Sequence, residues 1–432
     1  MWTGLLCAVL VILAIGLGGR AAATDCHVAP SGDDSNDGTS TQVILIAGPC
    51  RNTCIYNNTI YKDGRDGTYG KYGEFLILPI RPMLPKSLRT QSNMEDRSVN
   101  VSLSFAPFVR AFARALVLAL VLCGTASATD YYVSSVWGDD ANPGTSAEKP
   151  WKSLEPVNAK VFQPGDRILF GAGSRFLGQL KPQGFGVEGK PIVIDKYGDG
   201  PLPRFDGEGK VEATVYLFNV EYWEVQNIEV SNTDYEPSAE KGRRNGIYVH
   251  IDNFGTAHHI HLKNLHVRDV HGWGGHGSDS GDGIAWQNEG KQKPSNFDGL
   301  LIEGCHIQRT HLNGIWGFSQ HWIKEPWVPN LNVVIRNNLL EDLGSSGIVP
   351  VGCDGALVER NRVIRPSRKG GGIGIWPWSC DNTVIQFNEV SGSDGVKDGQ
   401  AFDSDWNCRN TVFQYNYSHD NKGGFMLVCT TS

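Results

Sequence analysis

From residue 223 onward, apolar and polar residues alternate in short segments that recur along the chain. A period of two is typical of a β-strand with one buried face. Each segment also carries a small or polar residue, usually Asn, at a fixed place between two such strands. The segments begin at Trp223, Ile260, Leu300, Val333, Ala356, Thr383 and Thr411. The pattern therefore predicts repeated pairs of short strands.

The spacing of these segments predicts a solenoid. The intervals between Asn337, Asn361, Asn388 and Asn416 are 24, 27 and 28 residues, and a period of this length fits one turn of a β-helix. The main alternative is a leucine-rich repeat. That fold has a shorter unit with a Leu-x-x-Leu-x-Leu pattern, which the chain lacks.

Cysteines repeat in the same register. Cys353, Cys380 and Cys408 each precede an Asn of the later series by eight residues. Stacked rungs bring equivalent residues to about 4.8 Å, so we expect these cysteines, extended by Cys429, to form one column inside the coil. Their parallel side chains would hold the Cβ atoms too far apart for an ideal disulfide. Free, stacked thiols are the expected state.

A Gly–apolar step, with Ala once in place of Gly, opens a further strand in each repeat. Glycine fits a tight corner where φ is positive or two backbones meet closely, and the apolar residue should point inward. The steps are Gly246-Ile247, Gly283-Ile284, Gly314-Ile315, Gly347-Ile348, Gly374-Ile375, Ala401-Phe402 and Gly424-Phe425. Three markers in one order predict an all-β chain, a right-handed parallel β-helix.

Residues 129–222 are expected to form the N-terminal cap and the first rungs. They contain Lys149-Pro-Trp151, Pro164-Gly-Asp-Arg-Ile-Leu-Phe170 and Tyr197-Gly-Asp-Gly-Pro201. In these motifs the chain resembles the start of secreted right-handed β-helix proteins of the pectate-lyase-like superfamily. The resemblance extends over roughly residues 130–432 and implies a fold rather than one reaction.

Residues 223–432 are predicted to be β-helix rungs that are truncated at the C-terminus. The sequence stops at Ser432, just after an expected strand over 425–429, and no polar capping segment follows. An open solenoid end exposes backbone donors and apolar side chains, which proteins normally cover. We therefore expect relatives to continue for further rungs.

Two stretches before the solenoid resemble export signals. Residues 1–24 join an apolar run to small residues, and residues 109–128 place a basic start and a nine-residue apolar run before Ala126-Ser-Ala128. Both have the order of a secretory signal peptide, and nine apolar residues are too few to span a bilayer. A buried core helix is the alternative for the second stretch. We expect a secreted protein, periplasmic or extracellular, with no stable membrane span after cleavage.

Residues 41–108 show neither a helical nor a strand period. The order Ala-Thr-Asp, Val, Gly-Asp-Asp, Asn, Gly-Thr-Ser follows both signal-like stretches, so the first 40 residues read as the start of a related gene. Segment 25–108 is therefore interpreted as a poorly ordered extension or a gene-fusion remnant, and residues 1–108 are expected to pack poorly against the solenoid.

Composition limits the function without defining it. The chain has 432 residues, of which 40% are hydrophobic and 20% charged, which is ordinary for a soluble protein. A net charge of −7 gives no electrostatic footprint for a nucleic acid. Five cysteines follow the second signal-like stretch, and an odd number does not favour a closed disulfide framework. We expect a monomer with no nucleic-acid partner.

The inward apolar residues determine which side chains point outward. Residues one and three positions after each of them should face solvent. Among these are Trp316, Trp376 and Trp378, whose rings offer a sugar a flat apolar surface, unless a long loop covers them. The outward pairs are Tyr248/His250, Ala285/Gln287, Trp316/Phe318, Val349/Val351, Trp376/Trp378, Asp403/Asp405 and Met426/Val428.

Asp403 and Asp405 lie two apart on one expected strand, with Cα atoms about 6.6 Å apart on one face. Asp398 precedes them, and His419 and Asp420 follow at the corner of the next rung. Grouped carboxylates push one pKa up and leave another ionised, as glycoside hydrolysis requires. We expect Asp403, Asp405 and Asp420 to be catalytic, with Asp398 and His419 beside the substrate. A Ca²⁺ site and a solvated turn are the alternatives; otherwise no cofactor is expected.

Residues 398–425 resemble a segment of a β-helix glycoside hydrolase family that has xylanase and α-L-fucosidase members. The resemblance implies catalytic carboxylates on a solenoid face, and we expect cleavage of a plant or algal polysaccharide. A polysaccharide lyase on the same scaffold is an alternative. It would use a Lys or Arg base, and Lys369, Arg368 and Arg409 lie near this face. A non-catalytic carbohydrate-binding or surface β-helix is the third possibility.

Histidines concentrate in one segment. Seven of the twelve lie in 250–276, close to a Gly- and Asp-rich stretch that contains His276 and Asp282. Such a segment could line a cleft or bind a metal. No H-E-x-x-H or comparable zinc spacing occurs, so the sequence favours a polar loop.

Overall fold

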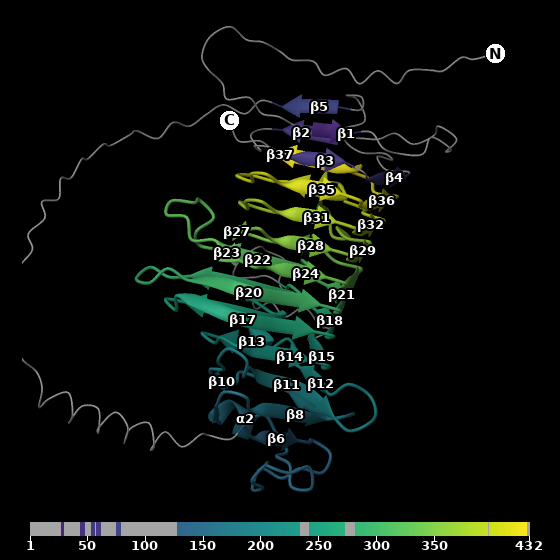
Figure 1. Ribbon diagram of the computed structural model, residues 1–432. Helices are drawn as coiled ribbons and strands as arrows, with labels where there is room; N and C mark the ends of the chain where they lie inside the picture. The colour runs from purple at the N-terminus through teal and green to yellow at the C-terminus, as the bar shows by residue number, and fades with distance from the viewer. Residues whose placement is uncertain are drawn as a thin grey trace, which may run out of the picture.

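The computed structural model describes residues 27–29, 44–47, 53–56, 58–61, 75–78, 128–233, 242–272, 281–395 and 397–429. The two signal-like stretches lie outside these ranges, apart from Ala128. Within the described ranges, no helix has the length and apolar composition needed to cross a membrane. The described strands stack along one axis, from β6 at one end to β5 at the other (Figure 1).

The chain winds into a parallel β-helix, as the repeats predicted. Each rung contributes short strands to three faces, and all pairings between the described strands are parallel. The first face is a fourteen-stranded sheet of β6 (Asp130–Val133), β8 (Arg167–Gly171), β11 (Ile192–Tyr197), β14 (Trp223–Gln226), β17 (Thr256–Lys263), β20 (Asn296–Glu303), β24 (Val334–Arg336), β28 (Leu357–Glu359), β31 (Val384–Gln386), β35 (Val412–Gln414), β3 (Cys54–Tyr56) and β1 (His27–Ala29), with β23 (Asn330–Leu331) and β27 (Cys353–Asp354) beside it.

The second face is a ten-stranded sheet that follows the first around each rung. Its strands are β9 (Arg175–Leu177), β12 (Arg204–Asp206), β15 (Glu229–Asn232), β18 (His266–Val270), β21 (His306–Thr310), β25 (Leu339–Glu341), β29 (Arg362–Ile364), β32 (Glu389–Ser391), β36 (Tyr417–His419) and β4 (Thr59–Tyr61).

The third face consists of two sheets joined through Ile375, which bridges Ile348 to Phe402. One sheet has β13 (Ala213–Phe218), β16 (Asn245–Asp252), β19 (Ile284–Glu289), β22 (Ile315–Ser319) and β26 (Ile348–Val349); the other has β34 (Phe402–Ser404), β37 (Met426–Cys429), β2 (Ile44–Ala47) and β5 (Phe75–Leu78). Two short pairs, β7 (Val161–Phe162) with β10 (Gln183–Gly184) and β30 (Gly371–Gly372) with β33 (Lys397–Asp398), and the helix α2 (Glu155–Ala159) complete the described elements.

Columns of apolar side chains fill the coil, because in-register stacking places equivalent residues above one another. Burial of each contributes roughly 1.5–3 kcal/mol, so the repeat pattern itself builds the core. One column runs through Ile194, Val225, Leu262, Ile302, Ile335, Val358, Ile385, Phe413 and Ile55, and all are at most 5% exposed.

A buried asparagine ladder marks the corner between the first two faces. The side-chain amide of Asn361 donates to Asn388 Oδ1 at 3.0 Å, and that of Asn388 donates to Asn416 Oδ1 at 3.0 Å. The prediction was wrong for Asn337, because this residue is exposed and has a φ of 57°. Asn338 takes its place, because pairing of Val334 with Leu357 sets the register one residue later.

Three of the four expected cysteines form a column of free thiols. The amide of Cys353 donates to Cys380 Sγ at 3.3 Å, and the amide of Cys380 to Cys408 Sγ at 3.5 Å. The prediction was wrong for Cys429. It ends β37 on the third face, whereas the column stands beside the fourteen-stranded sheet.

The Gly–apolar corners owe their glycines to close backbone approach. A Cβ on Gly374 would lie 2.4 Å from the carbonyl oxygen of Ala401 and 2.4 Å from a methyl group of Val390. The following residues point inward, as expected, up to Phe402. In the last rung the register differs from the expectation: Phe402 pairs with Met426, so Met426 and Val428 point inward and are buried.

Strands from the N-terminal part stack on the last rung, with β1, β2 and β3 next to β35 and β37 in Figure 1. β2 pairs with β37, β3 with β35 and β4 with β36. Asn58 continues the ladder, because its Oδ1 accepts a hydrogen bond from the Asn416 amide side chain at 3.0 Å. The expectation that this segment packs poorly against the solenoid is therefore wrong for these strands.

The sequence contains a signal for this stacking that the strand periodicity did not reveal. Cys50-Arg-Asn-Thr53 repeats Cys408-Arg-Asn-Thr411, the residues that lead into β35. In both copies a short apolar strand follows, then an Asn at the ladder position. Thr53 is buried, and its hydroxyl hydrogen-bonds to that of Ser404 at 3.2 Å.

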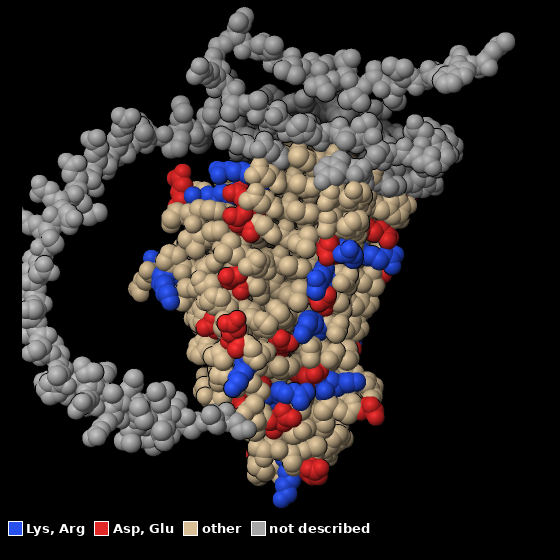
Figure 2. All heavy atoms as spheres, in the orientation of Figure 1, with Lys and Arg blue, Asp and Glu red and all other residues tan. Residues whose placement is uncertain are grey.

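Charged side chains of both signs intermix on the face shown in Figure 2. Ion pairs join neighbouring rungs: Arg336 Nε lies 2.7 Å from Glu303, and Arg362 Nε lies 2.9 Å from Glu389. Such exposed pairs contribute little to stability. They do neutralise one another, so the charges visible there form no block of one sign.

Candidate active site

Two outward columns on the third face bring the candidate residues together. Strand pairing places Trp316 against Val349 and Asp403 against Leu427, and the bridges through Ile375 put Trp376 between them. In the neighbouring column Val351 pairs with Trp378, and Asp405 follows in the next rung, next to Cys429. The strand register thus puts these residues on the outer side of the coil, as parity predicted, but Val349, Val351 and Asp403 are buried there and do not face solvent. The apolar strip consists of Trp316, Val349 and Trp376 in one column and of Val351 and Trp378 in the other, and the carboxylates lie at its end.

Tryptophans stand on both sides of this strip. The rings of Trp316 and Trp376 meet edge to face with centroids 6.0 Å apart, and the Trp376 indole N–H donates to Ser346 Oγ at 2.9 Å. Trp378 contacts Trp322 with ring centroids 5.3 Å apart. All four rings are half-buried, so they remain partly open to a ligand.

Trp322 and Trp406 are members of this aromatic group that the repeat pattern missed. Their ring centroids lie 5.1 Å apart. Trp322 belongs to the connection between β22 and β23, which has no counterpart in the repeats, so parity could not place it. Lys324 fixes this connection, because its ammonium group lies 2.5 Å from Asp381 and 2.7 Å from the carbonyl oxygen of Asn407.

Three carboxyl groups interact at the end of the strip: Asp398, Asp403 and Asp405. Asp403 is only 1% exposed, and burial, then Asp405, then Asp398, raises its pKa well above the usual range. Burial also raises the pKa of Asp405, where Asp398 adds a smaller effect. The pKa of Asp398 is raised by burial and lowered in part by Lys397. Mutual repulsion and desolvation therefore favour the protonated form of at least one group.

Access to solvent separates the three carboxyl groups. Asp398 and Asp405 are half-buried, whereas Asp403 lies under the surface. Oδ1 of Asp403 has no hydrogen-bond partner among the described residues, which fits a carboxyl group that is kept neutral by its surroundings. Asp398 and Asp405 are therefore the two carboxylates that a substrate could touch.

Cys429 joins the carboxylates from the next rung. One oxygen each of Asp403 and Asp405 and Sγ of Cys429 all lie within 4.8 Å of one another. Its place there follows from the pairing of Ser404 with Val428, which sets Cys429 beside Asp405. The sequence assigned Cys429 to the cysteine column and so missed it here.

The structure places His419 and Asp420 on a different face. His419 ends β36 of the ten-stranded sheet, and Asp420 follows it. Asp420 is exposed, and its carboxylate lies 3.0 Å from Nδ1 of His419. The structure thus brings together Asp398, Asp403 and Asp405 but not Asp420, which was expected to be the third catalytic carboxylate.

The residues considered as lyase bases lie at other positions. Lys369 and Arg368 line a pocket of about 350 Å³ together with His271, Arg309, Thr310, Asp342 and Gly344. Burial lowers the pKa of Lys369, and Arg368 pairs with Asp342 at 3.1 Å. Arg409 is exposed near the fourteen-stranded sheet. Lys397, which the sequence did not single out, is the cation that acts on Asp398.

The histidine-rich segment is divided between faces. His276 lies outside the described residues, and Asp282 is buried, with Oδ1 accepting the Asn313 amide at 2.9 Å. His250 stacks on Tyr248 on the third face, with ring centroids 5.2 Å apart. His259 and His261 lie on the first face beside Glu224; burial, and then His259, lowers the pKa of His261 to about 4.

Comparison with known proteins supports the fold and relates the chain to glycosidases. A model of the right-handed β-helix region matches residues 245–432. A lacto-N-biosidase of Bifidobacterium longum subsp. longum is 29% identical over 404 residues, which cover 71% of this chain and 25% of that protein. This solenoid is similar to that of lacto-N-biosidases. The solenoid is therefore right-handed, as predicted.

A solved structure gives the same relationship. The crystal structure of the GH136 lacto-N-biosidase from Eubacterium ramulus, as the native protein, has a TM-score of 0.60 and 28% sequence identity over 74% of this chain and 60% of that chain. Its selenomethionine derivative has a TM-score of 0.62. The chain thus spans a quarter of the length of the curated relative and about three fifths of the solved structure.

Proposed function

We propose that the chain is a glycoside hydrolase whose active site lies at Asp398 and Asp405. The observation that carries the proposal is a pair of solvent-accessible carboxylates at the end of a tryptophan-lined strip. The similarity to lacto-N-biosidases supports it. Glycosidases of the usual kind place two carboxyl groups on either side of the scissile bond.

The chemistry divides between the three carboxyl groups. Asp398 and Asp405 supply the acid and the base or nucleophile, since both reach solvent and both have raised pKa values. Asp403 acts as a positioning residue. Its neutral carboxyl group is held beside Asp405, where it adds no further negative charge, because two carboxylates this close cannot both ionise easily.

The tryptophans bind the sugar rings. Trp316 and Trp376 lie on one side of the strip, and Trp322, Trp378 and Trp406 on the other. Indole faces pack against the apolar faces of sugar rings, while neighbouring polar groups orient the hydroxyls. A strip with tryptophans on both sides accepts an oligosaccharide that lies along the rungs or that enters by one end.

The relatives change the expected substrate. Their names point to an animal milk oligosaccharide rather than to a plant or algal polysaccharide. We propose that this chain cleaves an oligosaccharide of the lacto-N-biose type, with Asp398 and Asp405 at the scissile bond. We further propose that it acts outside the cytoplasm as a monomer, because of the signal-like stretches and the ordinary charge of the chain.

An assay on a panel of sugars tests the proposal. The full chain is incubated with p-nitrophenyl lacto-N-bioside, milk oligosaccharides and plant polysaccharides. Release of p-nitrophenol or of a disaccharide supports the proposal. Absorbance of an unsaturated uronate would instead identify a lyase, and binding without cleavage would identify a carbohydrate-binding protein. A catalytically silent protein that also fails to bind any of these sugars would overturn the assignment.

A further inference from the structure

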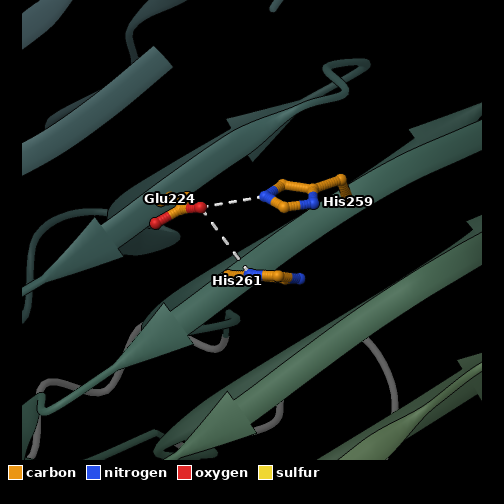
Figure 3. A group of neighbouring side chains, drawn as sticks. All are labelled: Glu224, His259 and His261. Atoms are coloured by element: carbon orange, nitrogen blue, oxygen red, sulfur yellow. Dashed lines mark hydrogen bonds and ion pairs between the residues drawn. The ribbon is translucent and has the colours of Figure 1, made fainter. Parts of the chain in front are cut away.

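Three potential metal ligands converge on the first face, away from the proposed active site. Glu224 lies on β14, and His259 and His261 lie on the adjacent strand β17 (Figure 3). Strand pairing sets Glu224 directly beside His261. His259 has a positive φ of 51°, and the side chains of His259 and His261 both lie beside Glu224, while Ile260 between them is buried.

The distances suit one shared ion. Glu224 Oε1 lies 2.9 Å from His259 Nε2 and 3.8 Å from His261 Nδ1, and all three ligand atoms fall within 4.8 Å of one another. Ligands about 2.0–2.1 Å from a tetrahedral zinc ion are about 3.3–3.4 Å apart. The separations of 2.9 and 3.8 Å lie on either side of that value, so small side-chain rotations would suffice.

Neighbouring residues hold the ligands in place. Lys263 Nζ lies 2.6 Å from Glu224 Oε2, which leaves Oε1 as the single oxygen directed at the histidines. The ring of Tyr222 stacks on that of His259, with centroids 6.0 Å apart and an interplanar angle of 17°. The two imidazoles are themselves stacked at 3.7 Å. A charged hydrogen-bond partner such as Lys263 orients a metal-ligating carboxylate and raises affinity.

We propose that Glu224, His259 and His261 form a binding site for a divalent cation of the zinc type. Two imidazole nitrogens and one carboxylate oxygen suit Zn²⁺, Co²⁺, Ni²⁺ or Cu²⁺ rather than Ca²⁺ or Mg²⁺, which prefer oxygen. The side chains are 17%, 34% and 22% exposed, so an ion can enter from solvent and a water can take the fourth position. The site joins two rungs of the coil and would stabilise their contact.

Another histidine pair on the surface provides a matched control. His266 and His306 stack on adjacent strands of the ten-stranded sheet, with ring centroids 5.1 Å apart. Each faces its own carboxylate: His266 lies 3.4 Å from Glu229, and His306 lies 2.9 Å from Glu341. They share the composition and exposure of the proposed site but not a common point for an ion.

Titration of the full, chelator-treated chain with ZnCl₂, followed by calorimetry, tests the site. The wild type should bind at this site, and His259→Ala, His261→Gln or Glu224→Gln should each weaken that binding by at least about 100-fold, since loss of an outer contact alone costs 10–100-fold. His266→Ala and His306→Ala should leave it unchanged. Circular dichroism checks that each variant is folded. If Glu224→Gln does not fold, the two histidine variants still test the site.

A second measurement identifies the ligands. Co²⁺ should give the visible spectrum of a nitrogen- and oxygen-ligated ion, without a thiolate charge-transfer band. Cys429→Ser removes a ligand from the other candidate group, Asp403, Asp405 and Cys429, and should not affect zinc binding. Unchanged zinc affinity in both His259→Ala and His261→Gln would overturn the proposal. Loss of zinc binding in Cys429→Ser would overturn it as well, because the ion would then lie at the carboxylates.

Discussion

Asp403 lies buried beside Asp405, with one carboxyl oxygen of each within 4.8 Å, yet only Asp405 reaches the surface. Strand parity predicted that both residues point outward from the coil, Asp403 from β34 and Asp405 just after it, and the register agrees. Strand parity predicts the side of the strand on which a side chain lies, but not how deeply that side chain is buried. Asp403 stands between Trp376 and Leu427 in its column and is 1% exposed. Two neighbouring columns thus hold one carboxylate for chemistry and one that acts through its neighbours.

The first prediction concerns the accessible pair. Asp405→Asn and Asp398→Asn should each lower kcat by about 10²–10⁴, the usual contribution of a positioned acid or base, with little change in melting temperature. Asp420→Asn is the matched control, because Asp420 is exposed on another face and its removal should leave kcat unchanged. A large loss in Asp420→Asn, with full activity in the other two, would move the active site to the ten-stranded sheet.

A second prediction follows from the raised pKa of Asp403. A carboxyl group whose pKa is higher in the folded state adds stability below its unfolded pKa, and this stability is lost as the pH rises through the folded pKa. Asn does not titrate, so Asp403→Asn should gain melting temperature relative to the wild type as pH rises from 4 to 8. Each unit of pKa difference corresponds to about 1.4 kcal/mol. Melting curves across this range with a constant difference would show that Asp403 is not perturbed.

The fold was predictable because a solenoid repeats the same few constraints. Alternation gave the strands, the Asn and Gly markers gave the register, and parity then selected Trp316, Trp376, Asp403 and Asp405 correctly as outward residues. The errors arose where one repeat departs from the others. A doubled Asn at 337 and 338 hid the true ladder position, and a one-residue register difference before Met426 misplaced the last rung.

The site was less predictable because contacts between rungs depend on features outside the repeat. Trp322 lies in an insertion, so no periodic rule places it next to Trp378. Asp420 looked close to the other carboxylates in sequence but lies around a corner of the coil. Glu224 and His261 are 37 residues apart and meet because their strands are neighbours. Such neighbours could have been found only by aligning all rungs before choosing candidates.

A third prediction tests the role of the tryptophans. Trp376→Ala should raise KM by about tenfold with a smaller effect on kcat, because removal of an aromatic contact costs roughly 0.5–1.5 kcal/mol. A change in KM alone reports the loss of a contact that the substrate and the transition state share. Trp376→Phe should retain much of the affinity. Trp137 is 54% exposed near the N-terminal end of the solenoid, so Trp137→Ala is the control and should leave both constants unchanged. An unchanged KM in Trp376→Ala would remove the ring from the substrate path.

A fourth prediction concerns the asparagine ladder. Asn388→Ala should lower the free energy of unfolding by about 3 kcal/mol or more, because Asn388 accepts two hydrogen bonds from Asn361 and donates one each to Val358 and Asn416. Each buried group left without a partner costs about 1–3 kcal/mol. Asn382→Ala removes an exposed Asn that bonds to Asp354 and should cost much less. Urea unfolding of both variants gives the comparison. Equal losses would mean that the ladder contributes no more than a surface contact.

The last prediction tests whether the N-terminal strands are part of the coil in solution. Ile55 is 5% exposed and pairs with Phe413, so Ile55→Asp would place a charge in the core column, at a cost large enough to release the segment. In the wild type, hydrogen exchange should be slow at residues 53–56 and at the Asn416 amide, which donates to Asn58 Oδ1 at 2.9 Å. Both should become fast in Ile55→Asp, while β14 in the middle of the solenoid stays protected and serves as the internal control. Fast exchange at residues 53–56 in the wild type would show that β3 does not stack on β35, and the last rung of the described solenoid would then be the one that contains β35.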